Sequence, residues 1–224
     1  MRKLLLLLAL AIACGSMALA TSTSDVLQIV AGTNPADVID DNVPGGGGVI
    51  VTTLDYYGWD IQITSGVTGS PTSQTGLDLD VQLEVYNGTL AAANPLTISY
   101  SDSGFTPVLG GFVFTPTGSI NGGGVGTETF TAYADTTEFG ETYPLGSLTI
   151  PPNGGGSINT VTPGALTAPF ALTLVDAFTY TSGTTIYSAD AAVAGVPEPA
   201  SVLLLGTLLL GGAVAFRRRK GLSS

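Results

Sequence analysis

The chain contains no histidine and one cysteine among its 224 residues, and its six basic residues all lie near the two ends. They are Arg2, Lys3, Arg217, Arg218, Arg219 and Lys220. Residues 21–195 therefore have no cation, and they hold every carboxylate except Glu198, sixteen of the 17, for a formal charge of −16. A polyanion without a cation cannot neutralise phosphates, which excludes nucleic-acid binding.

The absence of histidine and cysteine from residues 21–195 removes further classes of function. It excludes a nucleophile–imidazole pair, a zinc site of the usual kind and a disulfide framework. The glycine runs are interpreted as loops, since none is followed by the Lys-Ser or Lys-Thr pair of a phosphate-binding loop. We predict a non-enzymatic domain that is stabilised by a packed core.

The N-terminus has the three-part layout of a secretory signal peptide. Two basic residues precede the apolar stretch Leu4–Ala13, and the small residues Ala18 and Ala20 precede a change to polar sequence at Thr21. Signal peptidase accepts small side chains at the positions of Ala18 and Ala20. We therefore predict that residues 1–20 are a signal peptide, cleaved after Ala20.

Two other interpretations of this segment are open. Cys14 loosely resembles the lipidated cysteine of a lipoprotein signal, although that signal has a leucine where Ala11 stands. Alternatively, Leu4–Ala20 stays uncleaved as a membrane anchor, although Gly15 and Ser16 interrupt its short apolar part. The cleaved signal peptide fits the residues better than either.

The C-terminal segment has the features of a membrane-spanning helix. Residues 200–216 carry no charge and cover roughly 25 Å as a helix, which just spans a bilayer core of about 30 Å. The cluster Arg217, Arg218, Arg219 and Lys220 follows directly, and short segments rich in Lys and Arg stay in the cytoplasm. This orientation places the C-terminus inside and residues 21–195 outside.

A proline-rich motif, Val196, Pro197, Glu198 and Pro199, immediately precedes this helix. Motif, apolar helix 200–216 and basic cluster 217–220 together resemble the PEP-CTERM sorting signal of Gram-negative bacteria. The resemblance implies that an exosortase-type membrane enzyme processes the chain, which is then a substrate. It also implies anchoring in the inner membrane before processing, and afterwards a place on the cell surface or in the extracellular matrix. The resemblance covers residues 196–220 only.

Residues 21–188 are predicted to form a single acidic all-β domain, an antiparallel β-sandwich or a jelly-roll-like fold. The clearest strand is Leu77–Tyr86, where apolar residues on one face alternate strictly with Asp78, Asp80, Gln82 and Glu84, which are predicted to face solvent. The other predicted strands are 26–31, 49–54, 59–64, 96–100, 111–115, 127–133, 145–150, 169–180 and 184–188.

Two connections are also predicted. Asn87-Gly88 is a favoured tight-turn dipeptide, so it predicts a hairpin in which residues 96–100 return beside Leu77–Tyr86. Residues 189–195 are small and weakly polar, and we predict a linker that keeps the domain off the membrane.

Carboxylates are the chemically potent groups of this domain, and hard oxygen ligands suit Ca²⁺, which is the one cofactor hypothesis. Asp37, Asp40 and Asp41, beside Asn42, form one candidate cluster. Asp135, Glu138 and Glu141 form a second. Neither cluster has the order of a calcium-binding loop motif, so solvated surface is the competing interpretation.

A polysaccharide hydrolase or lyase needs two apposed carboxylates in a cleft lined by aromatic residues. Asp55 and Asp60 beside Tyr56, Tyr57 and Trp59 offer such a set, with core packing of the aromatic residues as the competing interpretation. We therefore predict a structural or interacting surface protein. A calcium-dependent carbohydrate-binding or adhesive module, held in an exopolysaccharide matrix, is the second hypothesis, and a carboxylate-based polysaccharide enzyme is the third.

Overall fold

A computed structural model describes residues 25–40, 49–70, 73–105, 111–123, 125–162, 170–183 and 185–195. The predicted signal peptide with Ala18 and Ala20, the calcium-ligand candidate Asp41, and the sorting tail 196–220 lie outside these residues. In the part of the chain that is described, no helix is both long enough and apolar enough to cross a membrane.

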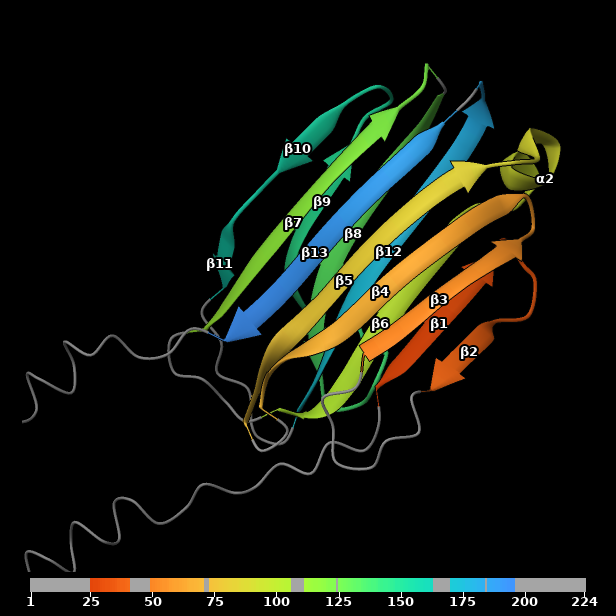
Figure 1. Ribbon diagram of the computed structural model, residues 1–224. Coiled ribbons are helices and arrows are strands. Elements are labelled where there is room, and N and C mark those ends of the chain that lie inside the picture. The colour runs from red at the N-terminus through yellow and green to blue at the C-terminus, as the bar shows by residue number, and fades with distance from the viewer. Residues whose placement is uncertain are drawn as a thin grey trace, which may run out of the picture.

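The strands form two antiparallel sheets that face each other (Figure 1). Sheet A has the order β2 (Asp37–Asp40), β1 (Val26–Ala31), β6 (Leu96–Phe105), β12 (Phe170–Ser182), β8 (Val125–Asp135) and β9 (Tyr143–Ile150). Sheet B has the order β10 (Gly155–Ser157), β7 (Phe112–Asn121), β13 (Ile186–Gly195), β5 (Ser73–Val85), β4 (Trp59–Ser70) and β3 (Val49–Tyr56), and β11 (Thr160–Thr162) also pairs with β7. The prediction of an antiparallel β-sandwich is confirmed.

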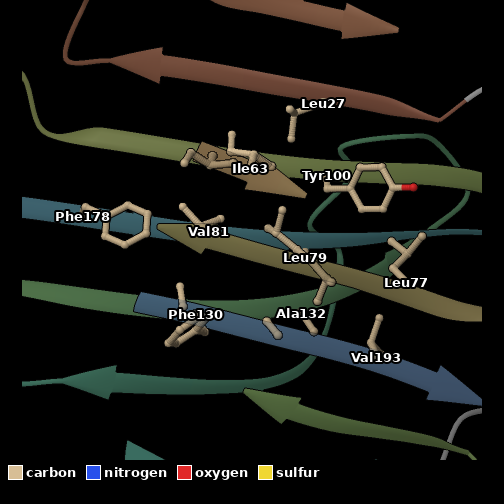
Figure 2. Packing of buried hydrophobic residues seen from close by; sticks show 14 of the residues in the cluster. Leu27, Ile63, Leu77, Leu79, Val81, Tyr100, Phe130, Ala132, Phe178 and Val193 are labelled. Atoms are coloured by element: carbon tan, nitrogen blue, oxygen red, sulfur yellow. The ribbon is translucent and has the colours of Figure 1, made fainter. Parts of the chain in front are cut away.

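The core lies between the inner faces of the sheets, as the alternation of apolar residues predicts. On β5, Leu77, Leu79, Val81 and Leu83 are buried, whereas the acidic residues between them are exposed. Figure 2 shows Leu77, Leu79 and Val81 together with Tyr100 and Phe178 of sheet A. Burial of this apolar surface is the main stabilising contribution to the domain, since cysteine is absent from residues 21–195.

The hairpin predicted at Asn87-Gly88 is wrong. Asn87 is the N-cap of a short helix, α2 (Gly88–Ala93), and its side chain accepts a hydrogen bond from the backbone N–H of Leu90 at 3.4 Å. The helix lets the chain cross from β5 in sheet B to β6 in sheet A. An asparagine side chain satisfies a helix N-terminus as readily as it forms a tight turn, so the dipeptide alone did not decide between them.

The linker predicted at residues 189–195 is also wrong, because these residues are the second half of β13. They pair with β5 on one side and with β7 on the other (Figure 1). Ala189, Ala191 and Val193 point into the core and are buried. The folded domain therefore extends to Gly195, directly before the sorting motif.

The other predicted strands are present and mostly longer than expected. β2, β10 and β11 were not predicted, because they are short and lie at or near sheet edges. A strand of three or four residues has too few positions to show an alternation of apolar and polar residues.

Candidate functional site

The outer face of sheet B carries most of the exposed acidic residues of the described strands. We call this surface the acidic face; its carboxylates are Asp55, Asp60, Asp78, Asp80, Glu84 and Asp190. The antiparallel register places Asp80 directly opposite Asp190, and Asp60 directly opposite both Asp55 and Glu84. Like charges in directly opposite positions repel and destabilise the sheet.

This repulsion is reflected in the protonation of two side chains. Partial burial, followed by the charges of Asp190 and Asp80, raises the pKa of Asp78. The pKa of Asp80 is raised by partial burial and then by Asp190. Since residues 21–195 contain no Lys or Arg, no basic side chain of the domain offsets this repulsion.

Two shallow hollows lie side by side on the acidic face. One, of about 170 Å³, is lined by Asp60, Gln62, Gln82, Leu83, Glu84 and Ile186. The other, of about 70 Å³, is lined by Gln62, Thr64, Asp80 and Gln82. The two glutamines border both hollows, so amide groups that can donate and accept hydrogen bonds lie between carboxylates. This mixture suits a polar ligand with many hydroxyl groups.

The outer face of sheet A has a different chemistry. Hydroxyl groups form hydrogen-bonded pairs across its strands, namely Thr127 with Thr179 at 2.7 Å, Thr129 with Thr149 at 3.2 Å and Thr131 with Ser147 at 3.4 Å. These pairs stabilise neighbouring strands. The two outer faces therefore differ, one being acidic and the other rich in paired hydroxyls.

The first predicted calcium cluster is not assembled by the described residues. Asp37 and Asp40 are the first and last residues of β2, so their side chains point to opposite faces of the strand. Within the residues that the structure describes, no group of three or more His, Cys, Asp or Glu side chains converges to hold a metal ion. Calcium binding by Asp37, Asp40 and Asp41 stays a prediction.

The second predicted cluster lies at the end of β8 and in its connection to β9, where Asp135 and Glu138 contact different partners and Glu141 is exposed. Asp135 accepts hydrogen bonds from the backbone N–H groups of Thr136 and Thr142. Hydrogen bonds from Thr142, then Thr136, lower the pKa of Asp135 to about 2. Glu138 instead accepts a hydrogen bond from the hydroxyl of Ser103 at 2.9 Å. Asp135 thus shapes the connection, and Glu138 attaches it to β6.

The aromatic residues considered as the lining of a polysaccharide-binding cleft do not lie on one surface. Trp59 is fully buried, donates a hydrogen bond to the carbonyl of Asn94 at 2.9 Å and contacts the rings of Phe178 and Tyr187. Tyr56 is half-buried and stands edge-on against the exposed Tyr57, with ring centroids 4.8 Å apart. Trp59 is therefore a core residue.

Glu128 and Asp176 are two of the four buried acidic residues of the described chain, none of which was predicted from the sequence. Both side chains point between the sheets and are at most 1% exposed. The alternation of the sequence could have indicated their burial, because residues two apart in a strand lie on the same face. Glu128 shares its face with the apolar Phe130 and Ala132. Asp176 shares its face with Leu174 and Phe178.

Comparison with known proteins shows weak likeness over the domain. The chain is similar to the K1 cleaved adhesin domain of Lys-gingipain from Porphyromonas gingivalis W83, with 12% identity, a TM-score of 0.36, and coverage of 67% of this chain and 99% of that chain. It is also similar to the CBM36-1 domain of a multidomain xylanase from the hindgut metagenome of Trinervitermes trinervoides, with 13% identity, a TM-score of 0.32, and coverage of 77% and 99%. Identities and TM-scores this low carry no information about the ligand of this chain.

No curated protein matches the sequence. One family model does match, and it covers the C-terminal tail that follows β13. Its description is the PEP-CTERM protein-sorting motif, and the match spans residues 195–220. The resemblance seen in Val196–Pro199, the apolar stretch and the basic cluster is thereby confirmed, and the chain carries a PEP-CTERM protein-sorting motif at its C-terminal end.

Proposed function

We propose that this chain is an exported surface or extracellular-matrix protein that an exosortase-type enzyme sorts through its C-terminal tail, and that its β-sandwich is a non-enzymatic structural or interaction domain. The match of residues 195–220 to the sorting motif is the observation that carries this proposal. The signal-peptide pattern of residues 1–20 supports export.

Within the tail, each residue type has a separate task. Pro197 and Pro199 fix their backbone φ angles and oppose a helix, so they favour an extended segment around Glu198 that a membrane enzyme can reach. The cluster Arg217–Lys220 holds the C-terminus in the cytoplasm. Signal peptidase thus acts on the signal peptide, and the membrane receives the tail, before the sandwich carries out its own function.

The non-enzymatic role is supported by the position of the two carboxylates weighed as a catalytic pair. Asp55 and Asp60 lie opposite each other on the open acidic face. Glycoside hydrolysis requires its carboxylates on either side of a bound sugar, with one of them kept protonated by its surroundings. Loss of polysaccharide turnover in Asp55→Asn or Asp60→Asn variants would establish the enzymatic alternative.

The sorting role predicts the effect of changes in the tail. Glu198→Ala, or removal of Arg217–Lys220, is expected to change the distribution of the protein between membrane, cell surface and medium. Fractionation of producing cells with immunoblotting measures this distribution. The matched control is Glu84→Ala, which removes a glutamate from the acidic face and is expected to leave sorting unchanged. Equal distributions for tail variants and parent would refute the proposal.

A calcium-dependent carbohydrate-binding or adhesive module is the second candidate, and the acidic face favours it. Asp80 and Asp190 oppose each other without a cation in the domain, and Ca²⁺ binds to carboxylate oxygens of this kind. Gln62 and Gln82 lie in the neighbouring hollows, where their amides can bond the hydroxyls of an exopolysaccharide.

For this candidate, Ca²⁺ is expected to raise the melting temperature of the full chain, because a ligand that binds only the folded state stabilises it by about 2.7 kcal/mol at 100 times its Kd. The double variant Asp80→Asn/Asp190→Asn should lose the effect. If the double variant Asp37→Asn/Asp40→Asn loses the effect instead, calcium binds at the first predicted cluster on β2 and not at the acidic face. If neither Ca²⁺ nor a chelator changes the melting temperature of the parent, this candidate is excluded.

A further inference from the structure

Glu128 and Asp176 lie on neighbouring strands in the interior of the sandwich. β8 and β12 pair so that Asp176 is opposite Phe130 and Phe178 is opposite Glu128. Glu128 is 0% exposed and Asp176 is 1% exposed. Phe130 and Phe178 are both within the cluster of core side chains drawn in Figure 2. We call these two carboxylic side chains the acid pair.

None of the four carboxyl oxygens of the acid pair has a hydrogen-bond partner among the described residues. On the opposite sheet, β7 presents Gly118, where an added Cβ would lie 2.8 Å from Oε2 of Glu128 and 2.8 Å from the Phe130 ring. The glycine therefore makes the room that the Glu128 carboxyl occupies. A carboxyl group fitted this closely against the backbone of β7 is a built feature of the core.

The surroundings offer the acid pair no positive charge. The other titratable groups of this part of the core are Tyr187 of β13 and Tyr180 of β12, and Tyr100 and Asp102 of β6. Asp25, just before β1, is a further buried acid, whereas the buried residues of β4, β5, β7 and β9 have no titratable group. Burial without a partner raises the free energy of an ionised carboxylate, so the protonated form is favoured here.

We propose that Glu128 and Asp176 form a buried proton-binding site, which makes the sandwich most stable in acid and loosens the contact between its sheets as the site ionises. This inference concerns the folded domain and does not depend on how the tail is processed. An exported domain meets the pH of its surroundings directly, so such a site would tie the rigidity of the protein to that pH.

The protonation behaviour supports the geometry. Burial raises the pKa of Glu128 from 4.5 to about 8, and burial followed by the nearby Glu128 raises the pKa of Asp176 well above its usual value. A group with a raised pKa binds more protons in the folded state, so its stabilisation is complete below pH 4.5 and is lost as the pH rises towards 8. For Glu128 alone this change corresponds to roughly a thousandfold increase in the unfolding equilibrium constant.

The test uses the full chain in detergent and follows unfolding by the fluorescence of Trp59, the one tryptophan. Trp59 contacts Phe178 and Tyr187 beside the acid pair. The melting temperature of the parent should fall steadily between pH 5 and pH 8, whereas Glu128→Gln/Asp176→Asn should show a much smaller fall. The matched control is Glu84→Gln/Asp60→Asn, the same two changes at opposed and exposed residues, which should keep the dependence of the parent.

A second measurement keeps the proposal falsifiable if the core variant fails to fold. Carboxyl carbon NMR of the parent should show one glutamate that titrates near pH 8. Normal titration of all glutamates, or a parent with equal melting temperatures at pH 5 and pH 8, would overturn the proposal. So would a rise in melting temperature on adding CaCl₂ at pH 8 that the parent shows and the core variant lacks, because the pair would then bind a cation.

Discussion

Deletion of residues 189–195, with the sorting tail kept, is expected to abolish cooperative folding of the domain. The deletion removes the half of β13 that pairs with both β5 and β7 and that buries Ala189, Ala191 and Val193. Burial of one valine contributes about 1.5–3 kcal/mol and each hydrogen bond about 0.5–1.5 kcal/mol. Their sum is comparable with the about 5–15 kcal/mol by which a whole domain is stable.

Thermal unfolding of the full chain, followed by circular dichroism and Trp59 fluorescence, measures this effect. The matched control inserts seven Gly and Ser residues between Gly195 and Val196, which lengthens the chain at the same place without touching β13. The insertion should leave the melting temperature unchanged. A deletion variant that melts like the parent would show that residues 189–195 are a linker after all.

Trp59→Ala is expected to cost about 3–5 kcal/mol of unfolding free energy, as large-to-small changes of buried aromatic residues do. Its indole fills the core against Phe178, Tyr180 and Tyr187 and donates a hydrogen bond to the carbonyl of Asn94. The variant would lose the packing of the indole, and the Asn94 carbonyl would lose its hydrogen-bond donor. Urea denaturation followed by circular dichroism gives the difference in free energy.

Tyr86→Ala is the matched control, because Tyr86 is an aromatic residue that follows the neighbouring strand β5 and is 55% exposed. Its substitution should change the unfolding free energy by less than about 0.5 kcal/mol. A Trp59→Ala protein with parental stability but impaired polysaccharide binding would instead support the interpretation that Trp59 lines a polysaccharide-binding cleft.

Much of the fold could be predicted from single segments of sequence. β1 was predicted with its observed bounds, and the alternation in β5 identified both its buried and its exposed residues. These predictions succeed because a strand with one buried face imposes a period of two on its own residues. The pattern needs no knowledge of the neighbouring strands.

The second half of β13 could not be predicted in this way. Its buried positions are occupied by Ala189, Ala191 and Val193 and its other positions include Ala192 and Ala194, so small residues obscure the alternation. Pairing with β5 and β7, whose residues are distant in sequence, makes this segment a strand. Strand preference depends strongly on such neighbours.

For the candidate site residues, too, the sequence predicts the face on which a side chain lies but not its partners. The exposure of Asp80 was predicted, but its opposition to Asp190 depends on a pairing between segments far apart in the chain. Glu128 could have been recognised as buried from its parity with Phe130, whereas its approach to Gly118 on the other sheet could not. Parity indicates the face on which a side chain lies, and only the three-dimensional structure indicates its partner.

The central places of β12 and β13 set the order in which the two sheets can form. These strands are the last of the domain to be synthesised, yet β12 lies between β6 and β8, and β13 lies between β5 and β7. Sheet A lacks its centre until β12 has been made as far as Ser182, and sheet B lacks its centre until β13 has been made as far as Gly195. The match to the sorting motif begins at that same residue, Gly195. The sandwich and the sorting motif therefore meet at one residue, and any cut before Val193 would remove part of the core.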